Sequence, residues 1–576
     1  MSRVRVPSVT PTKSESVSIR FFVYTNILYY FRTMIKIVWL DLNSSYAHSS
    51  LALPALHAQI KENTNVEWAV VSATINEQVG PIINKVYQEK PAIIAASMWL
   101  FNHEALMHLC ARLKALLPEV VIVLGGPEFL GNNETFLRNH PYVSCVFRGE
   151  GEEVFPQWLA TFNNAEQWAS ICGVCYVDAQ NRYRDNGKAV VTHFDQLTAP
   201  EESKFFNWEK PFVQLETTRG CFNTCAFCVS GGEKPVRALS LEQIKHRLDL
   251  IHKHGIKDVR LLDRTFNYHT RRAKALLDMF RQYAPHMRFH LEIHPALLTD
   301  ELKEALATLP TGLLHLEAGI QSLREEVLAT CKRKGTLNNA LQGLKYLCSL
   351  PNMVTHADLI AGLPLYTLSQ LFEDVHTLAQ YNAGEIQLEL LKLLPGTEMR
   401  LRAEELGICY SPLPPYEVLQ TREISIEQLQ TARQLSRLLD NYYNTEAWQQ
   451  VFKLLMLHDN QFLANFLQHY IHIGLIDQPL SLERRGLILY EYCREHYPAF
   501  LVEVSMAWIE NGLSLKKQPT ESVKTKHLTP PEKWQIVYGN YHKEMRLCVL
   551  PTAKAYIWYG YDREVQQDKP VFKAIE

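Results

Sequence analysis

The residues of this chain with the clearest chemical potential are three cysteines, Cys221, Cys225 and Cys228, in a Cys-x3-Cys-x2-Cys pattern. They follow an apolar run, residues 212–217, that predicts a strand, and Gly220 lets the backbone turn between strand and cysteines. Thiolates at these spacings can converge on one face of a compact loop, as iron–sulfur ligation requires. Three cysteines leave one iron of a cubane cluster without a protein ligand. That iron could bind a small molecule and pass it an electron.

A zinc site and buried core cysteines are the alternatives for this motif. Zinc would require a fourth Cys or His at suitable spacing, and the sequence shows no matching half-site. Cys172 and Cys175 form another Cys-x2-Cys pair, but no second ligand pair accompanies them. We interpret both as strand residues.

The cysteine motif after a strand resembles that of the radical S-adenosylmethionine (SAM) superfamily. The resemblance implies a 4Fe-4S cluster whose open iron is chelated by the amino and carboxylate groups of SAM. Reductive cleavage of SAM would then give a 5′-deoxyadenosyl radical. It also implies an electron donor of the flavodoxin or ferredoxin type.

The cysteine loop must be positioned by the elements around it, and the sequence predicts a parallel barrel for residues 206–400. Most of its strand-like segments are followed by a helix-like segment, which favours a partial (β/α)6 TIM-type barrel with its active site at the carboxyl ends of the strands. The cysteines follow the first strand, as that placement requires. The predicted strands are residues 212–217, 258–263, 288–293, 313–318, 355–360 and 385–393.

Residues at the later strand ends resemble SAM-binding positions of the same superfamily. A glutamate at a strand end is often only a solvated rim residue, and Gly-Leu-Pro and Pro-Gly are ordinary turn sequences. These strand-end residues count as evidence only as a set, because they recur in the expected order after successive strands. The resemblance implies SAM contacts from Glu317, Gln321, Ser322, Ile360, Gly362 and Leu394.

Short apolar strands alternate with amphipathic helices over residues 34–165. This pattern predicts a doubly wound parallel sheet, in which ligands sit beyond the carboxyl ends of the strands. The loops at those ends resemble the cobalamin-binding domain of one large radical SAM subfamily. The implied cobalamin contacts are Ser45, His48, Ser97, Gly125, Gly126, Glu128, Gly149 and Glu150.

One position departs from that cobalamin-binding pattern. Many such domains carry Asp-x-His-x-x-Gly after the first strand, whereas this chain has Asn43 where the histidine would stand. His48 could reach cobalt only if its loop turned back, and a histidine that opens a helix is more often a surface or capping residue. Either the corrin binds without a protein imidazole, or the domain keeps the fold and has lost the cofactor.

The remaining segments complete the predicted organisation. Residues 166–205 are expected to be a connector with a hairpin formed by residues 173–178 and 189–192. Residues 401–576 are expected to form a mainly helical domain that ends in short strands. Residues 1–33 have a transit-peptide-like composition, but we interpret them as a disordered or mis-assigned extension before Met34.

Composition narrows the class of protein. A chain of 576 residues with 47% hydrophobic and 21% charged residues is typical of a soluble enzyme of several domains. Its net charge of -2 shows no overall basic bias, so no nucleic-acid partner is expected. Its 12 cysteines fit a reducing cytoplasm better than a disulfide framework. No stretch predicts a transmembrane helix.

The leading hypothesis is a radical SAM enzyme that is cobalamin-dependent and methylates an unactivated carbon of a small-molecule or peptide substrate. A cobalamin-assisted cyclisation or rearrangement is an alternative, as is a non-catalytic corrin sensor or carrier. A tRNA methylthiotransferase-like function fits less well, because no basic stripe or added nucleic-acid domain is visible. Within the superfamily the chain resembles an uncharacterised branch with a C-terminal domain of unknown function.

Overall fold

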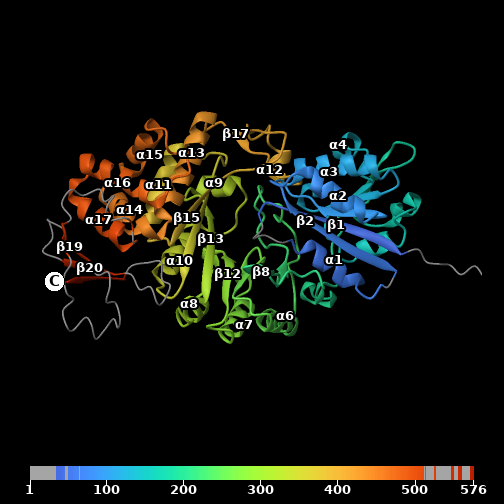
Figure 1. Ribbon diagram of the computed structural model, residues 1–576, viewed down its shortest axis with the longest axis horizontal. Coiled ribbons are helices and arrows are strands. Elements are labelled where there is room, and N and C mark those ends of the chain that lie inside the picture. The colour runs from blue at the N-terminus through green and yellow to red at the C-terminus, as the bar shows by residue number, and fades with distance from the viewer. Residues whose placement is uncertain are drawn as a thin grey trace, which may run out of the picture.

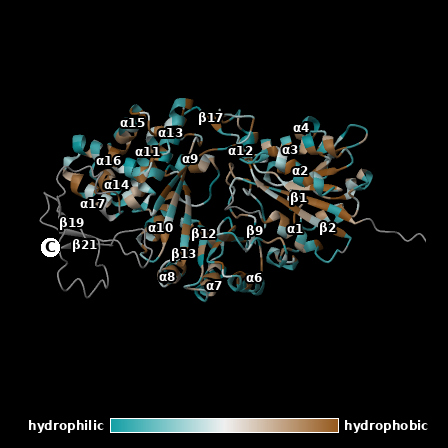
Figure 2. Cartoon of the chain, viewed as in Figure 1, coloured by the Kyte–Doolittle hydropathy of each residue, from teal (hydrophilic) through white to brown (hydrophobic). Residues whose placement is uncertain are grey.

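The computed structural model describes residues 34–45, 50–63, 65–511 and 513, together with the backbone of four strands between residues 524 and 575. Its parts follow one another along the long axis: an N-terminal sheet domain, a central half-barrel and a C-terminal helical domain (Figure 1). Apolar residues gather on the strands and on the inner faces of the helices (Figure 2).

The N-terminal domain is a seven-stranded sheet in the order β2-β1-β3-β4-β5-β6-β7. Strands β1 to β5 are parallel, as predicted. Helices α1 and α5 cover one face, and α2, α3 and α4 cover the other. The elements are β1 (Ile35–Asn43), α1 (Ala52–Ile60), β2 (Val66–Thr74), α2 (Val79–Gln88), β3 (Ile93–Ser97), α3 (His103–Leu116), β4 (Val121–Gly125), α4 (Glu134–Asn139), β5 (Cys145–Phe147), α5 (Phe155–Leu159), β6 (Val174–Val177) and β7 (Tyr183–Asp185).

The predicted hairpin exists, but its second strand was misplaced. Strand β6 pairs antiparallel with β7 across a turn at Asn181, which has a positive φ of 59°. Residues 189–192 were predicted to be that partner, yet Ala189 only forms an isolated bridge with Gly149. The apolar run Ala-Val-Val looked more strand-like than the polar Tyr183–Asp185. Because β6 also pairs with β5, the hairpin extends the N-terminal sheet.

The half-barrel is a six-stranded parallel sheet in the order β15-β14-β13-β12-β11-β8, which confirms the predicted partial barrel. Buried and half-exposed residues alternate along its strands, so one face packs on the helices and the other faces the lumen. Its elements are β8 (Phe212–Leu215), α6 (Leu241–Lys253), β11 (Asp258–Leu261), α7 (Thr270–Arg281), β12 (Arg288–Ile293), α8 (Asp300–Ala307), β13 (Leu314–Gln321), α9 (Glu325–Thr330), α10 (Leu337–Ser349), β14 (Val354–Ala361), α11 (Leu368–Gln380) and β15 (Glu385–Leu390).

The C-terminal helices cover the edge strand β15. A half-barrel leaves this edge with unpaired backbone groups, which invite association with other chains. The side-chain amide of Asn444 satisfies both polar groups of Ile386: its Nδ2 donates to the carbonyl (2.9 Å) and its Oδ1 accepts from the N–H (2.9 Å). The Tyr443 hydroxyl donates to Ala383 O at 2.8 Å. The elements are α12 (Glu398–Leu401), β16 (Cys409–Tyr410), β17 (Val418–Gln420), α13 (Ile426–Leu438), the π-helical turn η7 (Leu439–Tyr443), α14 (Glu446–His458), α15 (Phe462–His472), α16 (Leu482–His496) and α17 (Leu501–Glu510).

One hydrophobic cluster runs from the half-barrel through these helices, so the two parts share a core. Beyond them, an antiparallel sheet of four strands bears out the prediction of short strands near the end of the chain. Residues 1–33 and 527–545 lie outside the described residues. The strands are β18 (Lys524–Lys526), β19 (Arg546–Val549), β20 (Tyr556–Gly560) and β21 (Val571–Ile575).

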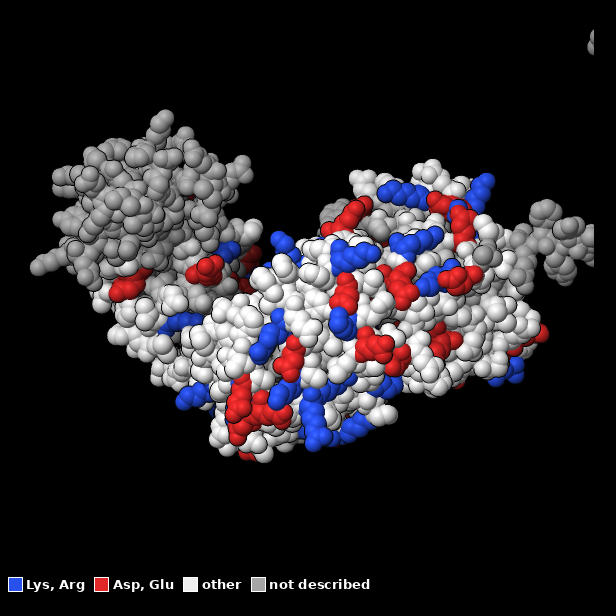
Figure 3. All heavy atoms as spheres, turned by 90° about the horizontal axis from the view of Figure 1, so that it is seen from below, with Lys and Arg blue, Asp and Glu red and all other residues white. Residues whose placement is uncertain are grey.

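Charged residues of both signs are intermixed on the face seen in Figure 3. None of the helices in the described part of the chain has the length and apolar character needed to span a bilayer.

Candidate active site at the carboxyl end of the half-barrel

The cysteine loop begins at a turn held by a buried carboxylate. Asp263, which follows β11, accepts hydrogen bonds from the backbone of Thr217 (2.7 Å) and Thr218 (3.0 Å), directly after β8. Gly220 then adopts a φ of 89°, where a Cβ would lie 2.6 Å from Glu233 O. This position therefore requires glycine.

The three predicted cluster ligands line one cavity at this end of the barrel, and none of their sulfurs is in a disulfide. Cys221 and Cys225 are buried, and Cys228 is half-buried. Burial raises the pKa of the Cys225 thiol, while the nearby Arg333 guanidinium acts in the opposite direction. Burial likewise raises the pKa of Cys228. A metal that binds here must therefore displace thiol protons.

Arg333 is a site residue that sequence reasoning missed. Its Nη1 lies 3.7 Å from Cys225 Sγ, and its Nη2 donates to Gly319 O at the end of β13. The loop is also held by two backbone bonds: Ala226 N donates to Cys331 O (2.8 Å) and Met399 N to Ala226 O (2.8 Å). The three contacts made by the cysteine loop join segments more than 100 residues apart, and no local motif marks them.

Three carboxyl groups line the cavity opposite the cysteines: Glu292 on β12, Glu317 on β13 and Asp358 on β14. Burial raises the pKa of Glu292 to about 7. Burial also raises the pKa of Asp358, and the nearby Glu317 carboxylate adds to that shift. Glu317 Oε2 lies 2.9 Å from His290 Nε2, a contact that lowers the pKa of Glu317. The cavity thus holds both neutral and charged acids near neutral pH.

His294, directly after β12, is a second cavity residue that sequence reasoning missed. Its side chain is buried, and both ring nitrogens are without a hydrogen-bond partner. Burial lowers its pKa to about 3, so the ring is neutral. A buried neutral imidazole in a ligand cavity can supply one donor and one acceptor to a bound molecule.

The sequence-predicted SAM contacts fall into two groups. Glu317 and Gln321 line the cavity, and Gln321 sits at a register shift of β13 with a φ of 71°. Ser322 is buried and bonds to Asp374 (3.4 Å), so it supports the loop after β13 from behind.

The other three contacts lie outside this cavity. Ile360 is on the lumen side of β14, and Gly362 (φ 86°) faces Leu429 of α13. The Leu394 carbonyl accepts from Thr397 Oγ1 at 2.8 Å.

Backbone conformation and close contacts with other backbone atoms account for the glycines Gly126, after β4, and Gly149, after β5. Gly126 has a φ of 110°, and a Cβ there would lie 2.5 Å from Met98 O. Gly149 has a φ of 103°, and its Cβ would collide with Ala189 O. Gly125 is less constrained, because a Cβ built at this position would lie 3.8 Å from Phe147 Cβ.

The polar residues of the same loops are engaged with protein groups. Ser97 O accepts from Asn102 Nδ2 at 3.1 Å. Glu128 is buried and lies 3.0 Å from His103 Nδ1. Ser45 is half-buried. His48 lies outside the described residues.

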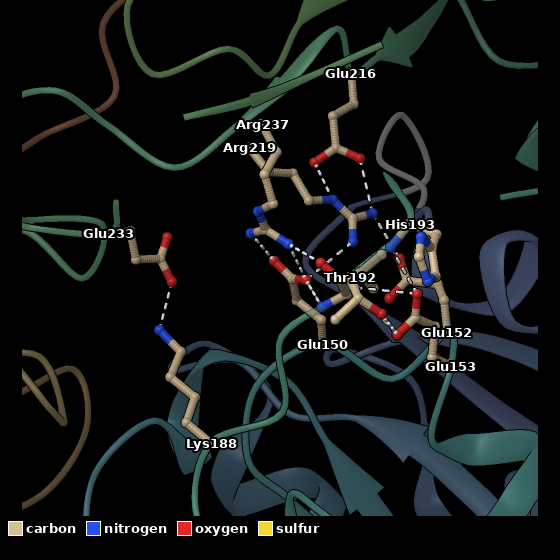
Figure 4. Close-up of polar contacts among 11 residues, drawn as sticks. Glu150, Glu152, Glu153, Lys188, Thr192, His193, Glu216, Arg219, Glu233 and Arg237 are labelled. Atoms are coloured by element: carbon tan, nitrogen blue, oxygen red, sulfur yellow. Dashed lines mark hydrogen bonds and ion pairs between the residues drawn. The ribbon is translucent and has the colours of Figure 1, made fainter. Parts of the chain in front are cut away.

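Glu150 joins the N-terminal sheet domain to the barrel. Its carboxylate forms two bonds with Arg237 (2.6 and 2.7 Å) and lies 3.7 Å from Arg219 Nη1 (Figure 4). Arg219 also bonds to Glu152 at 2.5 Å and to Glu216 at 2.8 Å (Figure 4). Since Arg219 immediately precedes Gly220, this network ties the loop after β5 to the start of the cysteine loop.

A second contact between the domains lies on the other flank. The Tyr416 hydroxyl donates to Glu128 Oε2 at 2.7 Å. Gly396, after β15, packs against Leu130 and Gly131, after β4, so closely that a Cβ would lie 3.0 Å from Leu130 O. Loops from the carboxyl ends of the two sheets therefore meet at two places.

Family comparisons identify both domains. Residues 215–378 match the family model described as the radical SAM superfamily, and residues 40–159 match that of the B12 binding domain. Residues 215–378 are therefore a radical SAM domain, and residues 40–159 are a B12-binding domain. Residues 404–507 match a protein family of unknown function, DUF4080, so this radical SAM protein carries the C-terminal domain that its sequence predicted. The cofactors that follow from these domains are a 4Fe-4S cluster, SAM and cobalamin.

Curated relatives of the radical SAM protein include the cobalamin-dependent radical SAM methyltransferase TokK of Streptomyces tokunonensis, 22% identical over 57% of this chain and 51% of TokK. A tRNA-2-methylthio-N(6)-dimethylallyladenosine synthase of Psychrobacter arcticus is 27% identical over 47% of this chain and 54% of its own length. An uncharacterized methyltransferase of Pyrococcus horikoshii is 28% identical over 27% of this chain and 35% of its own length. The chain thus spans about a third to a half of the length of these relatives.

Solved structures share the fold. The cobalamin-dependent radical enzyme OxsB, with aqua-cobalamin and SAM bound, superposes with a TM-score of 0.59 at 14% identity, over 83% of this chain and 79% of OxsB. The methyltransferase TsrM of Kitasatospora setae, with cobalamin and a 4Fe-4S cluster bound, gives a TM-score of 0.56 at 16% identity, over 67% of this chain and 82% of TsrM.

The sheet edge of the radical SAM protein fits a large flat ligand in two respects. The strand order reverses between β1 and β3, which is where doubly wound sheets bind ligands. The loop after β3 exposes two stacked aromatic rings, Trp99 and Phe101, whose centroids are 6.4 Å apart. At the position of the usual cobalt-ligating histidine, the Asn43 side chain donates to Asp41 at 2.8 Å.

Proposed function

We propose that this chain is a cobalamin-dependent radical SAM methyltransferase that acts on an unactivated carbon. One observation carries the proposal: loops at the carboxyl ends of the B12-binding sheet and of the half-barrel meet at two contacts, Glu150 with Arg237 and Glu128 with Tyr416. This arrangement would place a corrin on the first sheet opposite a cluster and SAM on the second. A substrate between them would be within reach of both.

Within this proposal the barrel residues bind the cluster and SAM and orient them. Cys221, Cys225 and Cys228 hold the cluster, and the cation of Arg333 beside Cys225 favours the thiolate. When bound, SAM and the cluster supply a 5′-deoxyadenosyl radical. Glu317 and Gln321 contact SAM from the β13 side of the same cavity. Ser322, Ile360, Gly362 and Leu394 act indirectly, by supporting the loops around the cavity.

The corrin would lie over Trp99 and Phe101, whose exposed rings offer it an apolar surface. Ser45, Ser97 and Gly125 lie along the same edge. Glu128, Gly126, Gly149 and Glu150 instead shape the loops and bind other parts of the protein. Asn43 has no imidazole, and its side-chain amide donates to Asp41, so we propose that cobalt takes no protein ligand from this position.

We further propose units at residues 34–165, 206–400 and 401–576, with 166–205 joining the first two. The electron donor would be a flavodoxin or ferredoxin in the cytoplasm, where thiols stay reduced. Glu292 and Asp358, neutral or charged according to pH, face the substrate space and would bind a polar group of a small molecule or peptide.

The test uses the full chain, reconstituted anaerobically with iron, sulfide and hydroxocobalamin, desalted, and mixed with dithionite and SAM labelled on its methyl group. We expect 5′-deoxyadenosine, a corrin retained after desalting, and transfer of the labelled methyl group to that corrin. Corrin retention without 5′-deoxyadenosine would instead indicate a sensor or carrier. Formation of 5′-deoxyadenosine together with corrin retention, but with no labelled methyl group on the corrin, would favour cyclisation or rearrangement.

A pair of variants tests the corrin surface separately. Replacing Trp99 and Phe101 together by alanine should lower corrin retention and leave the iron content unchanged. The matched control is Tyr87→Ala, which removes an exposed aromatic ring from α2 of the same domain. Equal corrin retention by both variants would contradict the proposal that the corrin lies over Trp99 and Phe101.

A further inference from the structure

The lumen of the half-barrel contains a layer of histidines below the cysteine cavity. The lumen of a closed TIM barrel is filled by branched apolar side chains. Here the lumen-facing positions near the starts of three adjacent strands are His290 on β12, His315 on β13 and His356 on β14. Edge strand β15 adds Glu385 beside them.

Three of these residues converge on one point. His356 and Glu385 are direct register partners, and His315 lies on the other neighbouring strand of β14. One ring nitrogen of each histidine and one carboxylate oxygen of Glu385 all lie within 4.8 Å of one another. Ligand atoms around a tetrahedral zinc ion are about 3.3 Å apart. Small side-chain rotations would bring the three atoms to that spacing.

The hydrogen bonding of the three residues is incomplete. His315 Nε2 is buried without a hydrogen-bond partner. His356 Nε2 lies 2.6 Å from Glu385 Oε2, so these two ligand atoms already face each other. The rings of His315 and His356 meet edge to face, with centroids 4.2 Å apart. Buried polar atoms without partners are costly, and a bound cation would satisfy all three ligands at once.

We propose that His315, His356 and Glu385 bind a divalent metal ion of the zinc type, separate from the iron–sulfur cluster. Two imidazoles and one carboxylate are a recurrent ligand set for zinc and related ions, with a water in the remaining position. All three residues are half-exposed, so solvent in the lumen gives the ion a route of entry.

The ion has a structural role in this position. Its ligands come from β13, β14 and β15, so it links three adjacent strands on the open side of the half-barrel. His290, whose ring packs against those of His315 and His356, connects this layer to Glu317 on the cavity wall. The ion therefore supports the strands that carry the cavity carboxylates.

The test measures zinc in two forms of the full chain. In the first, Cys221, Cys225 and Cys228 are replaced by alanine, which removes thiolates that would compete for zinc. After incubation with zinc and desalting, we expect about one zinc ion per chain and an unfolding midpoint raised by roughly 5 °C or more. In the second, the native chain is reconstituted with its cluster, and elemental analysis should find zinc in addition to iron. A chain that retains far less than one zinc ion in both forms would overturn the proposal.

Variants assign the ion to its ligands. His315→Ala and Glu385→Gln, each in the cysteine-free chain, should weaken zinc binding by at least about tenfold and abolish the midpoint shift. His246→Ala, which removes an exposed imidazole from α6, is the matched control and should bind zinc normally. Circular dichroism of each zinc-free variant separates loss of the ligand from loss of the fold. Equal zinc binding by the ligand variants and the control would overturn the assignment.

Discussion

The Tyr416 hydroxyl donates a 2.7 Å hydrogen bond to the Glu128 carboxylate, joining residues 288 positions apart in the chain. Tyr416 follows the half-barrel, and Glu128 follows β4 of the N-terminal sheet. Both groups are buried, so water does not replace the bond when it is lost.

Tyr416→Phe should weaken the contact between the two domains. The ring and its packing over the Arg400 guanidinium (4.4 Å) are kept, so the loss is that of the hydrogen bond. A hydrogen bond to a charged group contributes about 1.5–3 kcal/mol, and we expect a lower unfolding midpoint and faster proteolysis at the domain junction. Tyr410→Phe is the control, because its ring also lies near Arg400 (5.4 Å). Identical behaviour of the two variants would contradict this role for the bond.

Cys225→Ala should abolish retention of the iron–sulfur cluster, whereas Cys331→Ala should keep it. Cys331 is a buried thiol whose backbone carbonyl anchors the cysteine loop at Ala226, so it matches Cys225 in burial and neighbourhood. Iron and sulfide analysis with the brown chromophore provides the measurement. A cluster that survives in Cys225→Ala would mean that the ligands have been misassigned.

Glu292 should make the cluster-free chain less stable as pH rises. Burial raises its folded pKa from 4.5 to about 7, so between these values the folded state keeps a proton that the unfolded state has lost. Stability from this group is therefore full below about pH 4.5 and falls as pH rises toward 7, by at most about 3 kcal/mol. Glu292→Gln should flatten this slope in unfolding midpoints measured from pH 5 to 8. Glu326→Gln, an exposed site on α9, should leave the slope intact.

Asn444→Ala should expose the edge of β15. It removes the amide that satisfies both polar groups of Ile386, at a cost of about 1–3 kcal/mol, and it frees a strand edge for pairing between chains. We expect a lower unfolding midpoint and concentration-dependent aggregation by light scattering. The neighbouring Asn441→Ala is the control. Aggregation of both variants to the same extent would show that the effect is not specific to the edge.

Sequence patterns predicted the strands of the half-barrel well, because each apolar run is short and is bounded by polar turns. The strand Tyr183–Asp185 was not predicted, because its residues are polar. It lies at the edge of the sheet and buries little of its surface. The cysteine motif pointed directly to a cavity, since its spacing is local. Arg333 and His294 did not stand out, because their roles depend on contacts between distant strands.

The glycines show a different limit. Gly126 and Gly149 were predicted to be cobalamin contacts, but their φ values and the backbone atoms beside them already require glycine. One sequence shows only that glycine stands at a position, whereas the structure shows which atoms a side chain there would meet. The histidine layer carried a usable signal: a histidine at the second or third position of three consecutive strands.

The two contacts hold the carboxyl ends of the two sheets together at two points, so these ends can separate only if one contact breaks. One side-chain hydrogen bond and the packing of Gly396 join the domains on the Tyr416 side, whereas two arginines bind Glu150 on the other side. We therefore expect the domains to separate first at Tyr416 and to pivot about Arg219 and Arg237. Loading of a corrin would then be a gated event, slower than exchange of SAM within the barrel.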